Sequence, residues 1–400
     1  MKQLYRPYLS LPEPIHPRTW ASVDLRALRH NYRLLCHVIE CAERKIRPIA
    51  VVKADAYGHG APACVRALLE EGCDYFAVSC IEEAIAVRRA CGSRPAEILI
   101  LGYTDPADAE RLARENLIQT LLSASYAETL ANAATRANVR VRSQIALDTG
   151  MNRLGLPAQS EDGIKATAES IFRIRKCKNL QIEGIFSHFA RADEGEDGIC
   201  VTDEQTRRFR AVCERLEEQG CYFPLRHICN SAAAITRPTD RMDGVRLGIA
   251  LYGVCPSEQI SLPLRPVMRL CTTVIHIHRV SEGAEIGYGG AWKADGDRLI
   301  ATLPIGYADG WLRAYHGAEV RVETAEGARS VPIVGRICMD QCMVDVTNTA
   351  ARVGDTVILF GDDPHTLPAL AGRAGSIEYE SLCLISSRVP RVYSERLKGK

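Results

Sequence analysis

The sequence predicts an α/β fold, a (β/α)8 barrel of the TIM type followed by a mostly antiparallel β domain. Three observations lead to this prediction. Strand and helix patterns alternate from about residue 24 to residue 256, this stretch holds eight short apolar strands, and the pattern after Pro256 changes to β-branched, partly alternating strands. Strict alternation of strands and helices indicates a parallel sheet, and eight such units are typical of a closed barrel.

The first expected elements are a strand near 19–24, which could pair with the β domain, and a helix that runs to Ile39. Asp24 can cap this helix, because its carboxylate can accept from the first free N–H groups. The eight barrel strands are expected at 48–53, 75–80, 97–102, 118–122, 139–147, 182–188, 225–230 and 244–247, with amphipathic helices such as 61–71, 125–138 and 202–220 between them. A doubly wound open sheet is the alternative, but it usually carries a GxGxxG loop after a strand, and none occurs here.

The last third of the chain predicts strands at 267–280, 298–305, 319–323, 331–347 and 355–360. A helical patch, 367–374, interrupts them. Alternating β-branched segments separated by Gly, Asp and Asn indicate antiparallel pairing. We therefore expect an irregular arm at 1–18, a barrel domain at 19–256 and a β domain at 257–400.

Composition excludes several classes of function. The net charge of the 400-residue chain is +1, which gives no electrostatic case for nucleic acid or for a membrane surface. The N-terminus has four prolines and lacks the apolar core of a signal peptide. The sixteen cysteines form no CxxC pair, so we expect no metal site and a reducing, cytoplasmic location.

Lys53 is the first candidate functional residue. It ends a short apolar strand in the run Ala50-Val-Val-Lys-Ala-Asp-Ala-Tyr-Gly-His-Gly60. A partly desolvated lysine amine on a rigid element is the usual carrier of a Schiff base. The alternative is a lysine whose stem packs in the core while its ammonium group stays in water.

Polar residues gather at the ends of other predicted strands, where barrels of this type carry their chemistry. They are Asp148, Arg153, His188, Asn230, Ser231 and Arg246. A hydroxyl and backbone N–H groups at the start of a helix can bind a phosphate. A lysine on one side of a barrel mouth and such a phosphate site on the other suit pyridoxal phosphate.

The chain resembles the alanine racemases over roughly residues 18 to 396. The resemblance rests on motifs that occur in order along the chain: residues 50–60, Leu147-Asp-Thr-Gly-Met-Asn-Arg-Leu-Gly155, His188-Phe-Ala, Asn230-Ser-Ala-Ala-Ala, Val245-Arg-Leu-Gly-Ile-Ala-Leu-Tyr-Gly253, Ile286-Gly-Tyr-Gly, Leu303-Pro-Ile-Gly-Tyr-Ala-Asp-Gly-Trp311, Gly335-Arg-Ile-Cys-Met-Asp-Gln341 and Ser387-Arg-Val-Pro-Arg391. It implies the predicted fold, a pyridoxal 5'-phosphate cofactor, and the interconversion of L- and D-alanine, which supplies D-alanine for peptidoglycan.

The resemblance also implies roles for single residues. Lys53 would carry the cofactor and act as one base, and Tyr288 would act as the other. The cofactor would be bound by Tyr57, Ser231, Gly248 and Ile249 at its phosphate, by Arg246 backed by His188 at its pyridine nitrogen, and by Arg153 at its phenolic oxygen. The amino-acid substrate would meet Arg153, Met339, Tyr307 and Ser387. The family forms a homodimer, so Tyr288 and Met339 would come from the second copy.

Two positions depart from the family pattern. Ala146 stands where many members carry a modified lysine that braces the arginine numbered 153 here, and Asn152, Gln144 or a bound anion could take its place. Ser387 stands where well-known members carry a tyrosine, which leaves room for a serine substrate. A serine or broad-specificity alanine/serine racemase is therefore one alternative. A non-catalytic pyridoxal-phosphate carrier is a more distant one, because such proteins lack the β domain.

Overall fold

The computed structural model describes residues 18–40, 46–363 and 366–394. The chain divides into two compact units. One comprises Leu28–Ala56 and Ala61–Leu264, and the other takes in the described parts of Met1–Ala27, Tyr57–Gly60 and Arg265–Lys400. The predicted irregular arm lies outside the described residues up to residue 17.

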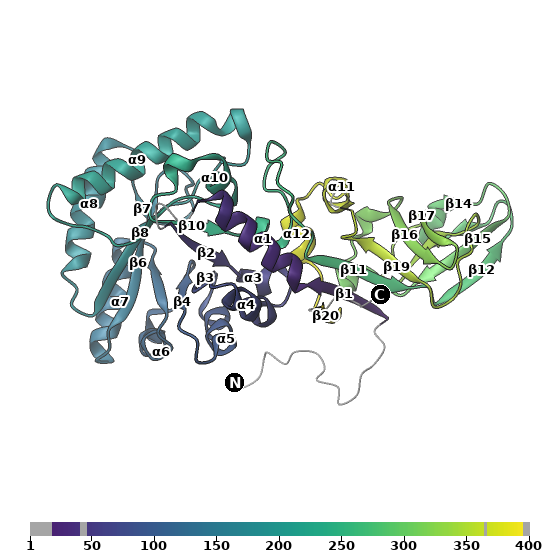
Figure 1. Ribbon diagram of the computed structural model, residues 1–400, viewed down its shortest axis with the longest axis horizontal. Helices are drawn as coiled ribbons and strands as arrows, with labels where there is room; N and C mark the ends of the chain where they lie inside the picture. The colour runs from purple at the N-terminus through teal and green to yellow at the C-terminus, as the bar shows by residue number, and fades with distance from the viewer. Residues whose placement is uncertain (1–17, 41–45, 364–365, 395–400) are drawn as a thin grey trace. The chain divides into compact units, whose positions relative to one another are not determined.

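The first unit is a closed parallel barrel, as the sequence predicts (Figure 1). Its strands pair in the order β5-β4-β3-β2-β10-β9-β8-β6, and β6 pairs with β5 to close the ring. They are β2 (Arg47–Val51), β3 (Tyr75–Val78), β4 (Glu97–Ile100), β5 (Ile118–Leu121), β6 (Val141–Asp148), β8 (Leu180–Phe186), β9 (Arg226–His227) and β10 (Gly244–Leu247). A two-residue strand, β7 (Leu156–Pro157), adds to β6.

Helices and short turns connect the barrel strands. They include α1 (Leu25–Val38), α4 (Ala61–Glu70), α5 (Ile81–Cys91), α6 (Ala109–Arg114), α7 (Ala124–Arg136), α8 (Glu161–Arg175), α9 (Ile199–Glu217) and α10 (Ser231–Thr236). Their starts follow from the sequence: the Ser123 and Ser160 hydroxyls and the Asn230 amide oxygen each accept from a backbone N–H in the first turn of α7, α8 and α10. Asp24 accepts from the N–H of Arg26 at 2.8 Å, which confirms the predicted cap of α1.

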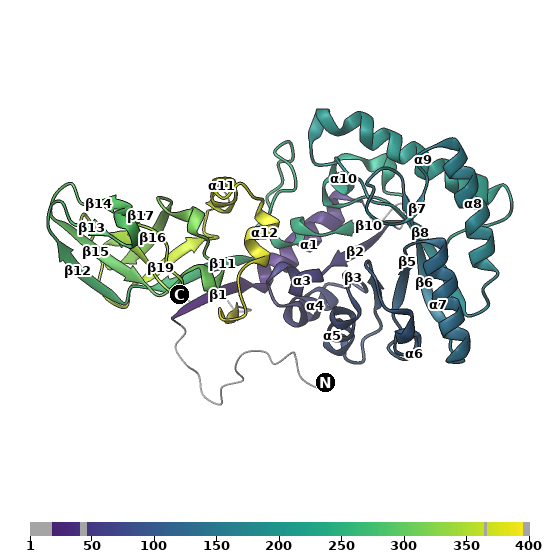
Figure 2. The same cartoon turned by 180° about the vertical axis from the view of Figure 1, so that it is seen from behind.

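The second unit is built on a mostly antiparallel sheet in the order β12-β15-β18-β17-β16-β19-β11-β1-β20 (Figure 2). Its strands are β1 (Thr19–Asp24), β11 (Met268–Thr273), β12 (His276–Val280), β15 (Arg298–Leu303), β16 (Glu319–Thr324), β17 (Gly327–Val334), β18 (Cys342–Asp345), β19 (Thr356–Phe360) and β20 (Arg391–Ser394). β1 pairs with β11 and β20, so the expected strand near 19–24 does join the β domain.

Several elements of this unit differ from the strands predicted for it. The predicted strand 267–280 is two strands, β11 and β12, and the predicted strand 331–347 is β17 and β18 separated by a loop that carries Met339. The helical patch near 367–374 is α11 (Thr366–Arg373). The short elements β13 (Glu285–Ile286), β14 (Trp292–Lys293), α12 (Glu378–Cys383) and β20 were not predicted, because segments this short carry little periodicity.

None of the helices in the described ranges is long and apolar enough to cross a membrane.

Candidate active site

Lys53 stands where β2 ends and a left-handed turn, α3 (Lys53–Tyr57), begins. The φ angles of Ala54, Asp55, Ala56 and Tyr57 are 51°, 52°, 58° and 52°, a conformation that costs about 1–2 kcal/mol for each non-glycine residue. Carboxylates compensate part of this cost. Glu83 accepts from the N–H of Ala54 at 2.7 Å, and Asp55 accepts from the N–H of Ala61 at 2.7 Å. Strain of this kind is typical of functional sites, and here it follows the candidate lysine directly.

Arg246 in β10 is a buried cation held by five acceptors. Its Nη2 donates to the carbonyls of Ser187 at 2.7 Å and Ile228 at 2.9 Å, and to Nδ1 of His188 at 3.0 Å. Its Nη1 donates to Nδ1 and to the carbonyl of His227. Because a guanidinium has no acceptor atom, both imidazoles must present an unprotonated Nδ1, so both are neutral and carry their proton on Nε2.

The pKa values of this cluster follow from its burial. Burial lowers the pKa of His188 well below 6.5, and the charges of Arg246, Arg153 and Lys53 lower it further. Burial and the charge of Arg246 act on the pKa of His227 in the same direction. Burial also lowers the pKa of Arg246 to about 10, so the guanidinium remains charged at neutral pH. Lys53, Arg153 and Arg246 therefore lie close enough to His188 for their charges to act on its pKa.

A hydrogen-bonded chain continues from Arg246 through the barrel interior. Nε2 of His227 donates to the amide oxygen of Gln144 at 2.8 Å, and the amide nitrogen of Gln144 donates to the hydroxyl of Tyr75 at 2.6 Å. We call Tyr75, Gln144, His227 and Arg246 the barrel relay. Sequence reasoning missed His227 and Tyr75, because polar residues inside a strand pattern give no sign of their partners.

Neither Gln144 nor Asn152 braces Arg153 in this structure. The side chain of Gln144 is committed to the barrel relay, and that of Asn152 contacts the Gly150 carbonyl and Gln159. Ala146 is buried, and its methyl group cannot replace a lysine. In the part of the chain that the structure describes, the exposed Arg153 makes no hydrogen bond or ion pair.

Ser231, Gly248 and Ile249 lie together at the ends of β9 and β10. The N–H of Gly248 donates to the hydroxyl of the buried Ser231 at 2.8 Å. Ile249 begins the 3-10 turn η4 (Ile249–Tyr252), and Ser231 begins α10. The predicted phosphate-binding residues of the barrel unit are therefore brought together.

The other candidates belong to the second unit and stand in exposed loops. Tyr288 is 71% exposed, Met339 53% and Tyr307 41%, and Ser387 is also exposed. The loops of Tyr307 and Met339 are joined, because the N–H of Tyr307 donates to the Cys338 carbonyl at 3.1 Å and that of Ala308 to the Met339 carbonyl at 3.0 Å. Gly306 permits this approach, since a Cβ there would lie 2.3 Å from the Cys338 oxygen.

Tyr57 differs from these exposed residues. It is buried in the second unit, where its ring lies 6.1 Å from that of Tyr379. Burial raises the pKa of its hydroxyl, so Tyr57 is a hydrogen-bond donor at neutral pH rather than an anion.

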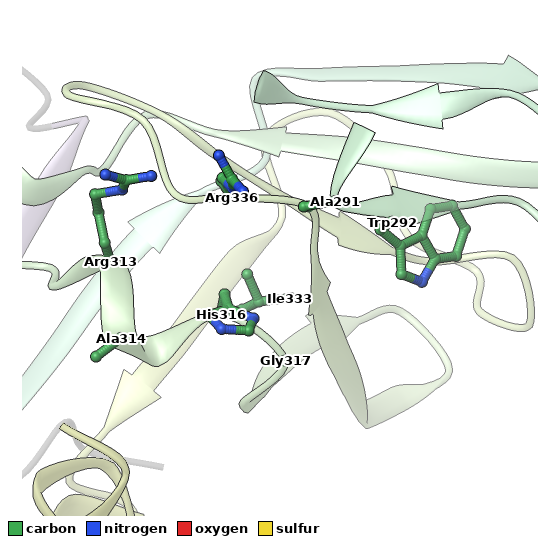
Figure 3. A pocket seen from close by; sticks show the side chains of 9 residues that line it. Ala291, Trp292, Arg313, Ala314, His316, Gly317, Ile333 and Arg336 are labelled. Carbon is green, nitrogen blue, oxygen red and sulfur yellow. The ribbon is translucent and has the colours of Figure 1, made fainter. Parts of the chain in front are cut away.

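A basic groove of about 580 Å³ opens beside the loop of Tyr288. Arg313, His316 and Arg336 line it together with Trp292 (Figure 3). Arg336 also adjoins Gly289, where a Cβ would lie 3.2 Å from its guanidinium. The groove therefore presents cationic side chains next to the candidate base Tyr288, which suits the approach of a carboxylate.

Two family models match the chain, the alanine racemase N-terminal domain over residues 23–256 and the alanine racemase C-terminal domain over residues 267–393. The chain belongs to the alanine racemase family. An alanine racemase of Clostridium tetani is 42% identical over 94% of this chain and 95% of its own length. One of Methanococcus maripaludis is 37% identical over 94% and 99% of the two chains.

Solved structures agree with this assignment. The alanine racemase of Clostridium difficile 630 superposes with a TM-score of 0.86 at 36% identity and covers 95% of this chain and 97% of that one. That of Bacillus anthracis with bound L-Ala-P gives a TM-score of 0.85 at 34% identity over 96% of each chain. The alanine racemase fold predicted from the sequence is confirmed, while the roles of single residues remain predictions.

Proposed function

We propose that this enzyme is a pyridoxal-phosphate-dependent alanine racemase that interconverts L- and D-alanine and supplies D-alanine for peptidoglycan. The observation that carries the proposal is the buried Arg246, which two neutral imidazoles hold as a cation in the same cluster as Lys53. A serine racemase or an alanine/serine racemase would use the same residues, and no observation favours serine over alanine as the substrate.

The residues present fit pyridoxal phosphate. Lys53 would bind it covalently, while Ser231 and the backbone N–H groups of Gly248 and Ile249, with Tyr57, would bind its phosphate. When bound, the cofactor supplies the electron sink that makes the α-proton of an amino acid acidic. Arg246 would face the pyridine nitrogen. Since its guanidinium keeps its proton, that nitrogen would stay unprotonated.

The proton transfers fall to Lys53 and Tyr288. Racemisation takes a proton from one face of the α-carbon and returns one to the other, so two bases that exchange roles between the two directions are the simplest arrangement. Arg153, Tyr307 and the backbone N–H of Met339 would orient the substrate carboxylate. Ser387 would lie beside the substrate side chain.

The exposure of Tyr288 and Met339 supports a homodimer in which each site is completed by the second copy. Catalytic tyrosines and methionines are seldom left in open solvent, because water competes for the groups they must bind. We also propose a barrel domain at 19–256, a β domain at 257–400 and a cytoplasmic location.

Exchange of the α-deuterium of labelled L- and D-alanine tests the proposal. The protein loaded with pyridoxal phosphate should release deuterium from both enantiomers, and Lys53→Ala should lose this activity by a factor on the order of 10⁴. Lys165→Ala, which removes an exposed lysine in the barrel unit, is the matched control. A protein that binds the cofactor but releases no deuterium would be a carrier, and the proposal would be wrong.

A further inference from the structure

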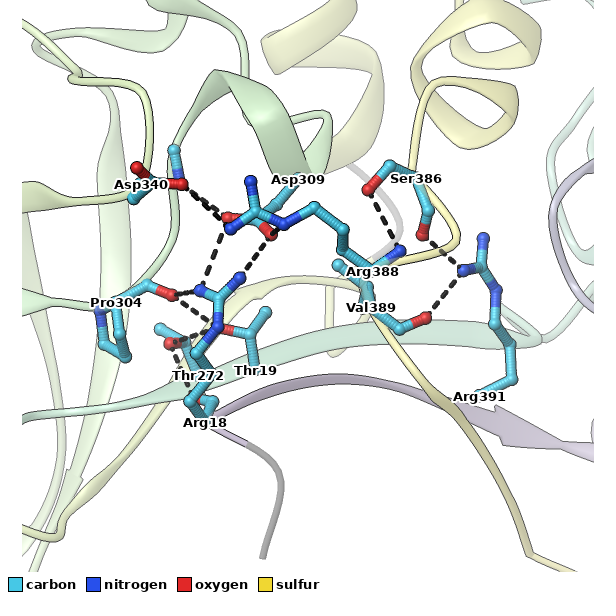
Figure 4. A network of polar contacts seen from close by, with 11 residues as sticks. Arg18, Thr19, Thr272, Pro304, Asp309, Asp340, Ser386, Arg388, Val389 and Arg391 are labelled. Carbon is cyan, nitrogen blue, oxygen red and sulfur yellow. Dashed lines mark hydrogen bonds and ion pairs between the residues drawn. The ribbon is translucent and has the colours of Figure 1, made fainter. Parts of the chain in front are cut away.

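Asp309 is a buried carboxylate in the second unit with two arginine partners that are far apart in the sequence. Its side chain is 0% exposed. Arg18 donates to one carboxylate oxygen at 2.6 Å and to the other at 3.4 Å, and it also donates to the Pro304 carbonyl. Nε of Arg388 lies 3.5 Å from the same carboxylate (Figure 4). A buried charge is stable only when it is paired and hydrogen-bonded, so this arrangement is costly to disturb.

The bonds of Asp309 reach three segments that carry candidate substrate residues. Its carboxylate accepts from the N–H of Gly306 at 3.1 Å, next to Tyr307. Its carbonyl accepts from the N–H of Ser386 at 3.0 Å, next to Ser387.

The third segment is reached through Arg388. Its Nη2 donates at 2.8 Å to the carboxylate of Asp340, which follows Met339. Figure 4 shows Asp309 and Asp340 converging on this guanidinium, with Arg18 beside them. Tyr307, Met339 and Ser387 therefore all lie next to residues of one network, which we call the Asp309 network: Arg18, Gly306, Asp309, Asp340, Ser386 and Arg388.

We propose that Asp309 is a positioning residue that sets the relative placement of Tyr307, Met339 and Ser387, and through them the affinity for the amino-acid substrate. The inference rests on the proposed function, which assigns these three residues to the substrate. Charge-assisted hydrogen bonds are roughly twice as strong as neutral ones. An asparagine amide at position 309 keeps the shape of the side chain but makes weaker, neutral hydrogen bonds. The segments of Tyr307, Met339 and Ser387 should therefore become more mobile together.

Hydrogen exchange tests the positioning without any need for activity. In the isosteric Asp309→Asn variant, the backbone amides of Tyr307, Ala308 and Ser386 should all exchange at least about tenfold faster. Asp362→Asn is the matched control, because Asp362 is a largely buried carboxylate of the same unit that pairs at 2.8 Å with Arg321 of β16, outside these segments. Faster exchange at Gly306 alone would overturn the proposal.

Steady-state kinetics test the effect on the substrate. Asp309→Asn should raise KM for L-alanine about tenfold and change kcat less than about threefold, since it moves binding groups and leaves Lys53 and Tyr288 in place. Asp362→Asn should change neither constant. An Asp309→Asn enzyme that melts earlier but keeps the wild-type KM would show a structural role only and would overturn the proposal.

A second variant covers the case in which Asp309→Asn does not fold. Arg388→Lys keeps a positive charge but cannot reach both carboxylates with a planar fork, so it should raise KM by a smaller factor of about three. An unchanged KM in this variant would contradict the network. A wild-type protein that racemises no alanine would instead refute the proposed function, and the exchange experiment would still decide the role of Asp309.

Discussion

The barrel unit buries the candidate residue Arg246, whereas the second unit exposes Tyr288 and Met339, which would meet the substrate. The side chains of Arg246, His227 and Gln144 are buried and joined by hydrogen bonds. Tyr288 and Met339 are more than half exposed, whereas the carboxylate of Asp309 in the same unit is buried.

The difference follows from what each group must do. Burial keeps the imidazoles of His188 and His227 neutral, because desolvation disfavours their charged form, and the carbonyl acceptors around Arg246 stabilise its charge. A residue that must meet a substrate, and in our proposal a second copy of the chain, has to remain accessible. Substitutions in the barrel relay should therefore cost stability, whereas substitutions of the exposed residues should cost activity alone.

Tyr288→Phe should have the largest effect on activity, and it should separate the loss of activity from any loss of stability most clearly. Loss of one acid–base group lowers kcat by about 10³-fold, and in a two-base mechanism α-deuterium release should fall much more for one alanine enantiomer than for the other. The free energy of unfolding should stay within about 0.5 kcal/mol of the wild-type value, because the ring is largely exposed.

The control for this variant is Tyr222→Phe, which alters a tyrosine of the barrel unit that is 65% exposed. It should leave both exchange rates unchanged. Equal losses for the two enantiomers in Tyr288→Phe would contradict the assignment of Tyr288 as one of two bases with opposite faces.

Acid should destabilise the barrel unit through the two buried histidines, His188 and His227. The pKa values of His188 and His227 are depressed in the folded protein, whereas unfolded histidine has a pKa near 6.5. The unfolded state therefore binds more protons below this pH, and the stability that these two residues contribute is present above about pH 6.5 and is lost as the pH falls. From pH 7 to pH 5.5 the loss should be about 2.5 kcal/mol for the pair.

Urea titrations at several pH values measure this loss. His227→Asn, which cannot bind the second proton, should show about half of the wild-type change between pH 7 and pH 5.5. A variant with the full wild-type dependence would show that His227 binds a proton as readily in the folded state as in the unfolded state, contrary to its acceptance of a hydrogen bond from Arg246.

Sequence reasoning was most successful where a pattern repeats over many residues. The alternation of strands and helices predicted the barrel, and the eight predicted barrel strands all exist. It failed where partners are distant in the sequence, as in the bonds of Arg18 to Asp309 and of Gln144 to His227. Such pairs leave no periodic trace, and nothing in a single sequence shows which of several arginines faces a given carboxylate.

The left-handed turn after Lys53 is another feature that could not be predicted from the sequence. Four consecutive non-glycine residues with positive φ run against local preference, so no propensity argument predicts them. They are stabilised by Glu83 and Asp55, whose role is visible only in three dimensions.

Gln144→Leu tests whether the barrel relay contributes to stability, and we expect a moderate effect on the free energy of unfolding. It leaves the Nε2–H of His227 without its acceptor and Tyr75 without its donor, at a cost of about 2 kcal/mol in the free energy of unfolding. Gln181→Leu, at an exposed position of β8, should change this free energy by less than about 0.5 kcal/mol. Equal stabilities of the two variants would show that the barrel relay does not hold Arg246.

Ser387→Tyr should give the smallest effect, because it alters the space beside the substrate side chain and neither base. A pocket distinguishes a methyl from a hydroxymethyl group by only about 1–3 kcal/mol. We expect the tyrosine to lower kcat/KM for L-serine about tenfold and for L-alanine less than about threefold, while Ser330→Tyr, at another exposed serine of the same unit, changes neither. If the wild-type enzyme already prefers L-alanine over L-serine by more than about a thousandfold, a gap of roughly 4 kcal/mol, groups other than Ser387 must reject serine.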